Sequence, residues 1–587
     1  MKLTPPAARK DPHILSLHGN SLCDDYGWLR EKENPETLEY LAAENAYTRA
    51  VMEPVQPLID TLYAEMLSHI QQTDVSVPYR DGRFDYYART VEGKQYPIYC
   101  RVLAAPQSAP RSLPPLSGFA DEEILLDVNQ LAAGQAFFSI GASVVNDNGD
   151  WLAYTTDNTG FRQYTLHAKN LLAGATLESL AERVGSVAWA ADNRTLFYSV
   201  EDEETKRPYQ ILRRTLDAEK QIFSAAELVW QDTDERFNVG VGRTRDGKYL
   251  IVEAVSHTTS EQWFLAADHP AGTLRCIEPR RDNIEYSVDH RDGVFFIRVN
   301  DTGRNFRLVA VKVDELPRAD HNHWQEILPH REDVMLEDVD LFQHFFVSCE
   351  RFQGLPRLRI YTLTGQGTLA EQAHQSPREI SFPEPTYTAT PGINREFNVT
   401  AYRYGYLSLI TPSSVFQYDL ATRQSTLLKQ VEVPGGFDRT LYTSERILAT
   451  AHDGVQVPIS LVYRRDRFQH GTNPLYVYAY GSYGYSLPIG FNSNRLSLLD
   501  RGMVLAYAHI RGGGEMGKPW HDAGRMMHKM NTFTDFIAVT EHLIEAGYGA
   551  KDRVGIEGGS AGGLLMGAVT NMRPELFRVV LSHVPFV

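Results

Sequence analysis

Residues 554–563, Val-Gly-Ile-Glu-Gly-Gly-Ser-Ala-Gly-Gly, decide the fold class of the carboxyl-terminal region. Apolar runs lie on both sides of Ser560, so its G-x-S-x-G pattern stands at a predicted strand-to-helix turn. The flanking glycines allow the close backbone approach that such a strained turn requires. The stretch predicts a nucleophilic Ser560, with the Ala561 N–H at a helix N-terminus facing a developing oxyanion.

Strand-like and helix-like runs alternate around this turn. The strand-like runs are 455–463, 475–480, 503–509, 554–557 and 579–584, and the helical runs are 532–546 and 562–572. This alternation predicts a parallel α/β sheet. A Pro/Gly cluster at 433–436 marks where the region begins.

A different pattern fills the preceding 350 or so residues, where a tight polar turn repeatedly comes before a hydrophobic strand. The turns are Asp81-Gly82, Asn148-Gly149, Asp192-Asn193, Asp246-Gly247 and Asp292-Gly293, with weaker copies near 341–347 and 394–400. Most of these turns lie roughly 45 to 53 residues apart. A period of about 40 to 50 residues with several strands per repeat is typical of propeller blades. We therefore predict a seven-bladed β-propeller, with a pair of unrelated β-sandwiches as the alternative.

Apolar residues between Pro35 and about Gln71 recur at helical spacing. The sequence thus predicts three parts. Residues 1–75 form a helical segment that packs on the catalytic domain, residues 76–432 form the propeller, and residues 433–587 form the α/β domain.

Composition narrows the possible functions. The formal net charge of −16 argues against a nucleic-acid partner, which needs a basic surface. Four widely spaced cysteines indicate neither a disulfide framework nor a metal knot. The amino terminus lacks the apolar run of a signal peptide, and no long apolar stretch follows. We expect a cytoplasmic protein without membrane association.

Two further clusters invite other interpretations. Residues 511–518, Arg-Gly-Gly-Gly-Glu-Met-Gly-Lys, match G-x-G-x-x-G, but Pro519 stands where a phosphate loop needs Ser or Thr and no helix opens inside the run. We expect this loop to shape the active-site rim instead. His321-Asn322-His323 lacks a third ligand, so no metal site is predicted.

Several motifs together resemble those of the prolyl oligopeptidase family, and within it those of oligopeptidase B. They are 478–484 (YAYGSYG), 495–502 (RLSLLDRG), 509–515 (HIRGGGE) and 558–563 (GGSAGG), with 17–19, 26–30 and 427–435 nearer the amino end. The likeness covers nearly the whole chain.

The resemblance implies a cytoplasmic serine peptidase in which a propeller caps an α/β-hydrolase domain. Such an enzyme admits short peptides and cleaves after Arg or Lys, without a metal or cofactor. The resemblance also implies that the Tyr480 hydroxyl joins the Ala561 N–H in the oxyanion hole.

One departure from the family concerns the catalytic triad. In α/β-hydrolases the acid and the histidine follow the serine, but after Ser560 the chain holds only Glu575 and His583, at unsuitable places. We therefore expect the hydrolase domain to be incomplete at its C-terminal end, with the triad Asp and His not in this chain. The chain alone should be inactive unless a separate C-terminal fragment completes it.

A second departure concerns specificity. Oligopeptidase B enzymes that favour paired basic residues carry acidic side chains after the position of Tyr485, whereas this chain has Ser-Leu-Pro-Ile-Gly at 486–490. A dibasic preference is therefore not expected. A proline-specific oligopeptidase of the same fold, a catalytically dead propeller-based binding protein and an esterase remain the alternatives.

Overall fold

The computed structural model describes residues 3–105, 112–217, 219–316, 321–365, 367–374 and 377–586. They divide into two compact units, Met1–Ile70 with Ser493–Ser497, and Gln71–Asn492 with Leu498–Val587. Among the helices of these residues, none combines the length and the apolar character that a bilayer crossing requires.

The first unit contains a hairpin and two helices. Strands β1 (His13–Leu17) and β2 (Asn20–Asp24) pair antiparallel, and α1 (Pro35–Met52) and α2 (Gln56–Ser68) occupy the predicted helical region. The Asn34 side chain caps α1 by accepting a hydrogen bond from the Glu36 N–H, and Pro35 suits the first helical position. The hairpin was not predicted. The packing of this segment on the catalytic domain stays a prediction.

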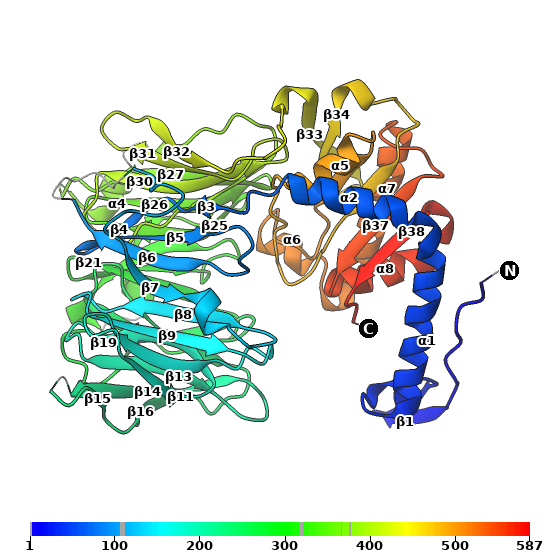
Figure 1. Cartoon of the computed structure of the whole chain (residues 1–587). Coiled ribbons are helices and arrows are strands. Elements are labelled where there is room, and N and C mark those ends of the chain that lie inside the picture. The colour runs from blue at the N-terminus through cyan, green and yellow to red at the C-terminus, as the bar shows by residue number, and fades with distance from the viewer. Residues whose placement is uncertain are drawn as a thin grey trace. The chain divides into compact units, whose positions relative to one another are not determined.

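Seven sheets of consecutive antiparallel strands follow one another in the second unit, and they form the predicted seven-bladed β-propeller (Figure 1). Blades 1 to 3 are β3 (Asp74–Val75), β4 (Tyr79–Asp81), β5 (Phe84–Thr90), β6 (Ile98–Leu103), β7 (Glu123–Asp127); β8 (Ser139–Val145), β9 (Trp151–Asp157), β10 (Thr165–Asn170), β11 (Thr176–Ala181); and β12 (Val184–Trp189), β13 (Thr195–Glu201), β14 (Pro208–Asp217), β15 (Ile222–Phe223), β16 (Glu227–Gln231).

Blades 4 to 7 have four strands each. They are β17 (Asn238–Arg243), β18 (Tyr249–Val255), β19 (Ser260–Ala266), β20 (Arg275–Glu278); β21 (Tyr286–Arg291), β22 (Val294–Val299), β23 (Arg307–Lys312), β24 (Gln325–Leu328); β25 (Val334–Leu341), β26 (Phe345–Phe352), β27 (Leu355–Thr362), β28 (Arg378–Glu379); and β29 (Tyr387–Pro391), β30 (Ala401–Ser408), β31 (Ser414–Asp419), β32 (Ser425–Gln430). Short helices α3 (Val128–Leu131) and α4 (Leu369–His374) lie in loops.

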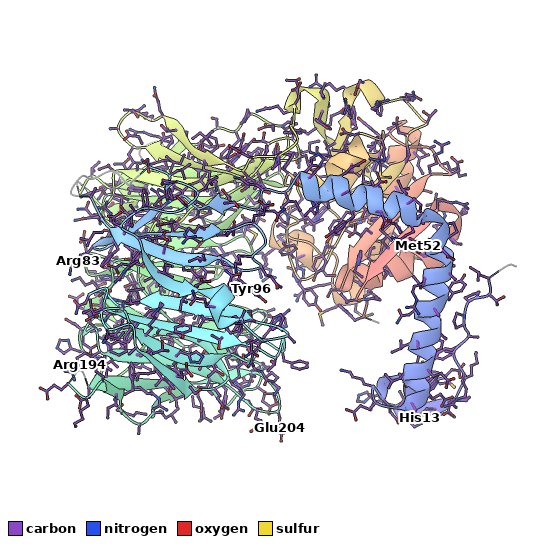
Figure 2. The ribbon with its side chains drawn as sticks, viewed as in Figure 1. His13, Met52, Arg83, Tyr96, Arg194 and Glu204 are labelled. Carbon is purple, nitrogen blue, oxygen red and sulfur yellow. The ribbon has the colours of Figure 1, made fainter. Side chains whose placement is uncertain are left out.

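The repeated polar turns have one structural role. Each turn joins two neighbouring antiparallel strands near the start of its blade, as Asp246-Gly247 joins β17 to β18. Figure 2 shows Arg83 and Arg194, which follow two of these turns, at one end of the blades. It shows Tyr96 and Glu204, in the next connections along the chain, at the opposite end. We call these the turn end and the connection end of the propeller.

Side chains join the first blade to the last. Lys429 Nζ of blade 7 lies 2.6 and 2.7 Å from the two carboxylate oxygens of Asp74 in blade 1. Arg403 donates to the Pro78 carbonyl oxygen at 2.6 Å, and the Gly82 N–H donates to Glu396 at 2.7 Å. Because each blade uses only consecutive strands, ring closure depends on such contacts.

The catalytic domain has a six-stranded sheet in the order β33-β34-β36-β35-β37-β38. Its strands are β33 (Tyr442–Thr450), β34 (Gln456–Arg464), β35 (Leu475–Tyr478), β36 (Val504–Ala508), β37 (Val554–Gly559) and β38 (Val579–His583), and its helices are α5 (Leu496–Leu499), α6 (Lys518–Asp522), α7 (Met530–Glu545) and α8 (Ala561–Met572). The predicted parallel pairing is present for β36, β35, β37 and β38, but it is wrong for one edge of the sheet. There β33 and β34 form a hairpin and β34 runs antiparallel to β36. The hairpin turns at Gly454, whose φ of 86° suits glycine.

Candidate active site

Ser560 lies in the sharp turn between β37 and α8. Its backbone has φ 55° and ψ −115°, a conformation that is rare for a residue with a side chain. Gly558 is required beside it, because a Cβ there would come within 2.3 Å of the Gly562 carbonyl oxygen. The Ser560 side chain is exposed, so the turn presents its hydroxyl at the carboxyl end of the sheet.

Two hydrogen-bond donors lie next to this hydroxyl. Ala561 is buried and begins α8, where the first N–H groups of a helix have no partner within the helix. The Tyr480 hydroxyl is close enough to the Ser560 side chain to interact with it, and burial raises the pKa of the Tyr480 phenol. The phenol therefore stays protonated at neutral pH and can donate. The structure brings the three predicted site residues together.

The loop that carries Tyr480 is packed on two sides. A Cβ at Gly562 of α8 would lie 2.9 Å from the Ala479 carbonyl oxygen. On the other side, Gly481 has φ 66°, and a Cβ there would come within 2.7 Å of Ile510 and Thr532. Close backbone contact thus fixes the path of the chain on both sides of Tyr480.

The glycine-rich loop is anchored by a buried ion pair. Arg511 donates to Asp535 of α7 through its backbone N–H, Nε and Nη2, at 3.0, 2.8 and 2.6 Å, and its Nη1 lies 2.6 Å from Asp453. Arg511 and Asp535 are 4% and 0% exposed. A Cβ at Gly512 would lie 2.2 Å from the Gly481 carbonyl oxygen. The glycine-rich loop therefore packs directly against the backbone of the loop that carries Tyr480.

Glu575 and His583, the acid and the histidine that follow Ser560 in the chain, have other partners. His583 Nε2 lies 3.3 Å from Glu557 Oε1, and Glu575 pairs with Arg573 at 2.6 Å. In the part of the chain that the structure describes, no imidazole hydrogen-bonds to the Ser560 side chain. The other histidine pair from the sequence, in the 3₁₀ turn His321–His323, contacts Glu278 through the His321 Nδ1 at 2.9 Å.

The stretch 486–490 is packed rather than free. Leu487 and Ile489 are 8% and 4% exposed. The Leu487 N–H donates to the buried Glu515 at 2.9 Å, and the Ile489 N–H donates to Thr388 of blade 7 at 2.8 Å. This stretch also lines a cavity of about 360 Å³ against blades 6 and 7.

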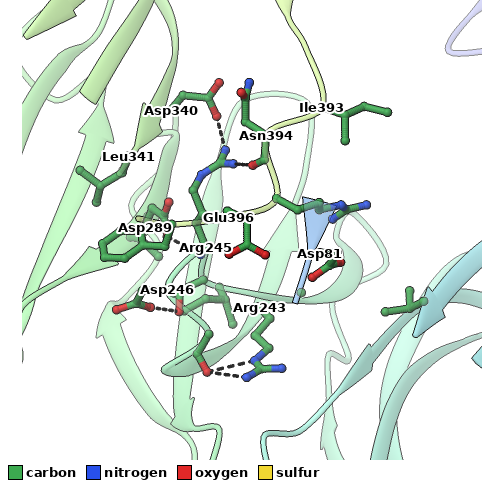
Figure 3. Close-up of a pocket in the computed structure, with 18 of the residues that line it drawn as sticks. Asp81, Arg243, Arg245, Asp246, Asp289, Asp340, Leu341, Ile393, Asn394 and Glu396 are labelled. Atoms are coloured by element: carbon green, nitrogen blue, oxygen red, sulfur yellow. Dashed lines mark hydrogen bonds and ion pairs between the residues drawn. The ribbon is translucent and has the colours of Figure 1, made fainter. Parts of the chain in front are cut away.

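A larger cavity of about 910 Å³ occupies the propeller channel, and Ser560 is not among its lining residues. Arginines from one turn of blade 4 cross its mouth. Arg243 binds Asp147 of blade 2 through two contacts of 2.9 Å, and Arg245 binds Asp340 of blade 6 and the Asn394 carbonyl oxygen of blade 7. Figure 3 shows Arg245 reaching both of the latter. The turn end of the channel is thus spanned by contacts between blades that are not neighbours.

Asp289, in the same channel, should make stability depend on pH. Burial raises the pKa of Asp289 from 3.8 to about 6. The folded state therefore binds this proton more tightly than the unfolded chain, and the free energy of unfolding falls as pH rises from about 4 to about 6. The contribution is at most about 3 kcal/mol, since one pKa unit corresponds to about 1.4 kcal/mol.

Asp289→Asn keeps an acceptor for the Arg245 N–H but removes the titration. We expect its melting temperature to fall less than that of the parent chain between about pH 4.5 and 6.5. Asp292→Asn, at an exposed turn of the same blade, is the matched control. Parallel melting profiles for Asp289→Asn and the parent chain would contradict the prediction.

Comparison with known proteins decides the family. Residues 5–431 match the model of the prolyl oligopeptidase N-terminal beta-propeller domain, and residues 489–587 match that of the prolyl oligopeptidase family. The chain belongs to the prolyl oligopeptidase family. It is a serine-type peptidase, and the resemblance drawn from its motifs is confirmed.

Relatives within the prolyl oligopeptidase family match the whole chain. It is 41% identical to dipeptidyl aminopeptidase BI of Pseudoxanthomonas mexicana, over 100% of this chain and 80% of that protein. It is 34% identical to protease 2 of Moraxella lacunata, over 100% of this chain and 81% of that protein. Oligopeptidase B from Leishmania major is similar in structure, with a TM-score of 0.89, 32% identity, and coverage of 100% of this chain and 82% of that one.

These matches give no support to the expectation that the catalytic domain is incomplete, because the prolyl oligopeptidase family model matches through residue 587.

Sequence analysis also missed Lys529 and Asp535, which support the Tyr480 and glycine-rich loops. Neither lies in a motif, and their partners are 48 and 24 residues away. The one available signal was Asp535, a carboxylate between the apolar residues Phe533 and Phe536.

Proposed function

We propose that this chain is an oligopeptidase of the oligopeptidase B type that hydrolyses short peptides after Arg or Lys. The observation that carries the proposal is Ser560 in its strained turn, with the Tyr480 hydroxyl beside it and the Ala561 N–H next in the chain. Relatives named protease 2 and oligopeptidase B, at 34% and 32% identity over the whole chain, support the assignment.

In the proposed reaction, Ser560 Oγ attacks the carbonyl carbon of the scissile peptide bond and its proton passes to a base. The Tyr480 O–H and the Ala561 N–H donate to the oxyanion of the tetrahedral intermediate. Collapse breaks the C–N bond, the amine leaves with a proton from the base, and the acyl group stays on Ser560. Water then releases the acid and regenerates the serine.

The base does not come from the described residues around Ser560, whose hydroxyl has Tyr480 as its partner. An alcohol without an adjacent base is a weak nucleophile. We therefore propose that residues 1–587 by themselves hydrolyse peptides very slowly and that residues outside this stretch supply the acid and base. No metal or other cofactor enters the proposed mechanism.

A cationic substrate is consistent with the charge of the protein. The net charge of −16 favours the approach of basic peptides. The buried apolar stretch around Leu487 and Ile489 offers no carboxylate for a second basic residue, so we propose single rather than paired basic sites. A cytoplasmic location is also proposed, because all four cysteines are free thiols.

A second candidate activity rests on a specific observation. The relative at 41% identity is named dipeptidyl aminopeptidase BI. Release of dipeptides from a free amino terminus would use the same serine and oxyanion hole, but would require recognition of the terminal amine.

A peptide panel separates these activities. We expect the chain, supplied with the part of dipeptidyl aminopeptidase BI that the alignment leaves uncovered, to cleave blocked Arg and Lys reporters at least about 10-fold faster than Pro reporters. Cleavage only of unblocked dipeptide reporters would favour the aminopeptidase. A preference for Pro would favour a proline-specific oligopeptidase. Silence of a well-folded complex toward peptides and esters would favour a binding protein.

A further inference from the structure

Lys529, the residue before α7, is tied to the loop that carries Tyr480. Its Nζ lies 2.7 Å from the Gly481 carbonyl oxygen and 2.7 Å from Ser482 Oγ. Gly481 and Ser482 follow Tyr480 directly in the chain, and Ser482 is buried. One ammonium group therefore holds both residues next to the tyrosine.

The ammonium is held at an electrostatic cost. Burial lowers the pKa of Lys529 to about 8, and no neighbouring carboxylate raises it again. Other buried cations near the site are paired, as Arg511 is with Asp535. A partly desolvated cation without a counter-ion is unfavourable for folding, so its place against the loop that carries Tyr480 points to a functional use.

The surroundings leave the loop little freedom once this contact is made. Gly481 packs against Ile510, Thr532 and the backbone of Gly512 with no room for a Cβ. Gly562 packs against the chain at Ala479 on the opposite side. The Lys529 contacts are the hydrogen bonds that hold Gly481 and Ser482 to α7, so their loss should let the loop move away from Ser560.

We propose that Lys529 is a positioning residue for oxyanion stabilisation, which keeps the Tyr480 hydroxyl beside Ser560 by holding Gly481 and Ser482. The inference rests on the proposed function, in which Ser560 and Tyr480 act on the substrate. Lys529 itself acts only through Tyr480.

The test uses the rate at which a fluorescent organophosphonate labels Ser560 in the chain supplied with the segment from dipeptidyl aminopeptidase BI, because the phosphonyl oxygen occupies the oxyanion hole. We expect Lys529→Met to slow labelling about 10- to 100-fold, as a displacement near 1 Å can do. Lys529→Arg should restore most of the rate. Lys551→Met, at an exposed lysine of the same domain, should leave the rate unchanged.

A double-mutant cycle distinguishes positioning from general damage. In a Tyr480→Phe background, Lys529→Met should slow labelling by less than about 2-fold, because its effect requires the hydroxyl. An equal loss in both backgrounds, or no loss in either, would overturn the proposal.

Hydrogen exchange needs no reactive serine, so it can be measured on the 587-residue chain and its Lys529→Met variant without any organophosphonate. Lys529→Met should speed exchange in the peptide that covers residues 480–485 and leave the α8 peptide unchanged. If the parent chain is not labelled even when supplied with the segment from dipeptidyl aminopeptidase BI, the proposed function fails while exchange still decides whether Lys529 holds the loop. Unchanged exchange at 480–485 would overturn the proposal.

Discussion

Ser560→Ala will abolish the covalent organophosphonate labelling that the chain shows once the segment from dipeptidyl aminopeptidase BI is supplied. With the segment from dipeptidyl aminopeptidase BI supplied, it will also lower kcat/KM for an Arg reporter by on the order of 10⁴-fold or more. The expected loss is this large because the serine oxygen forms the bond to the acyl group. Hydrogen bonds from Tyr480 and Ala561 can stabilise an oxyanion but cannot replace the nucleophile.

The control is Ser582→Ala, since Ser582 lies opposite Gly558 on the neighbouring strand and has no role in the proposed reaction. It should keep both labelling and turnover within about 2-fold of the parent chain. Persistent labelling of Ser560→Ala at the parental rate would place the reactive group elsewhere in the molecule.

Asp535→Asn will destabilise the catalytic domain by about 3–5 kcal/mol, because it removes the buried carboxylate of the ion pair and leaves the Arg511 charge with only the partly exposed Asp453. The midpoint of urea unfolding, followed by a probe in the catalytic domain, measures the effect. We also expect slower labelling of Ser560, since the glycine-rich loop contacts the Tyr480 loop.

Asp466→Asn provides the matched comparison. It removes the same chemical group from another Arg–Asp pair, the one between Arg464 and Asp466. In this pair the Asp466 side chain is 54% exposed. Exposed pairs contribute about 0–1 kcal/mol, so the midpoint should hardly move. Similar effects of the two substitutions would show that burial of Asp535 is not what makes its pair important.

The propeller and the elbow are predictable because their signals are local. A turn such as Asp246-Gly247 joins adjacent strands, and the G-x-S-x-G pattern around Ser560 needs only its flanking strand and helix. The placement of Tyr480 beside Ser560 came from the family resemblance, because their separation in the chain hides the contact from any local pattern.

The antiparallel edge and the supporting ionic contacts were not predictable in the same way. Strand β33 pairs with β34 through a tight turn at Gly454, which the sequence analysis did not recognise as a hairpin. Lys529 and Asp535 look like ordinary polar positions on a helix until the fold places Gly481 and Arg511 against them. Such long-range contacts carry no periodic signal.

The seam between blade 7 and blade 1 has a consequence for synthesis on the ribosome. Each blade uses consecutive strands, so it can form its own hydrogen bonds soon after it emerges. The contact of Lys429 with Asp74 joins residues 355 positions apart, so the ring can close only after nearly the whole propeller has been made. Until then the nascent chain is an open arc of blades, and the catalytic domain is translated only after the residues that close that arc.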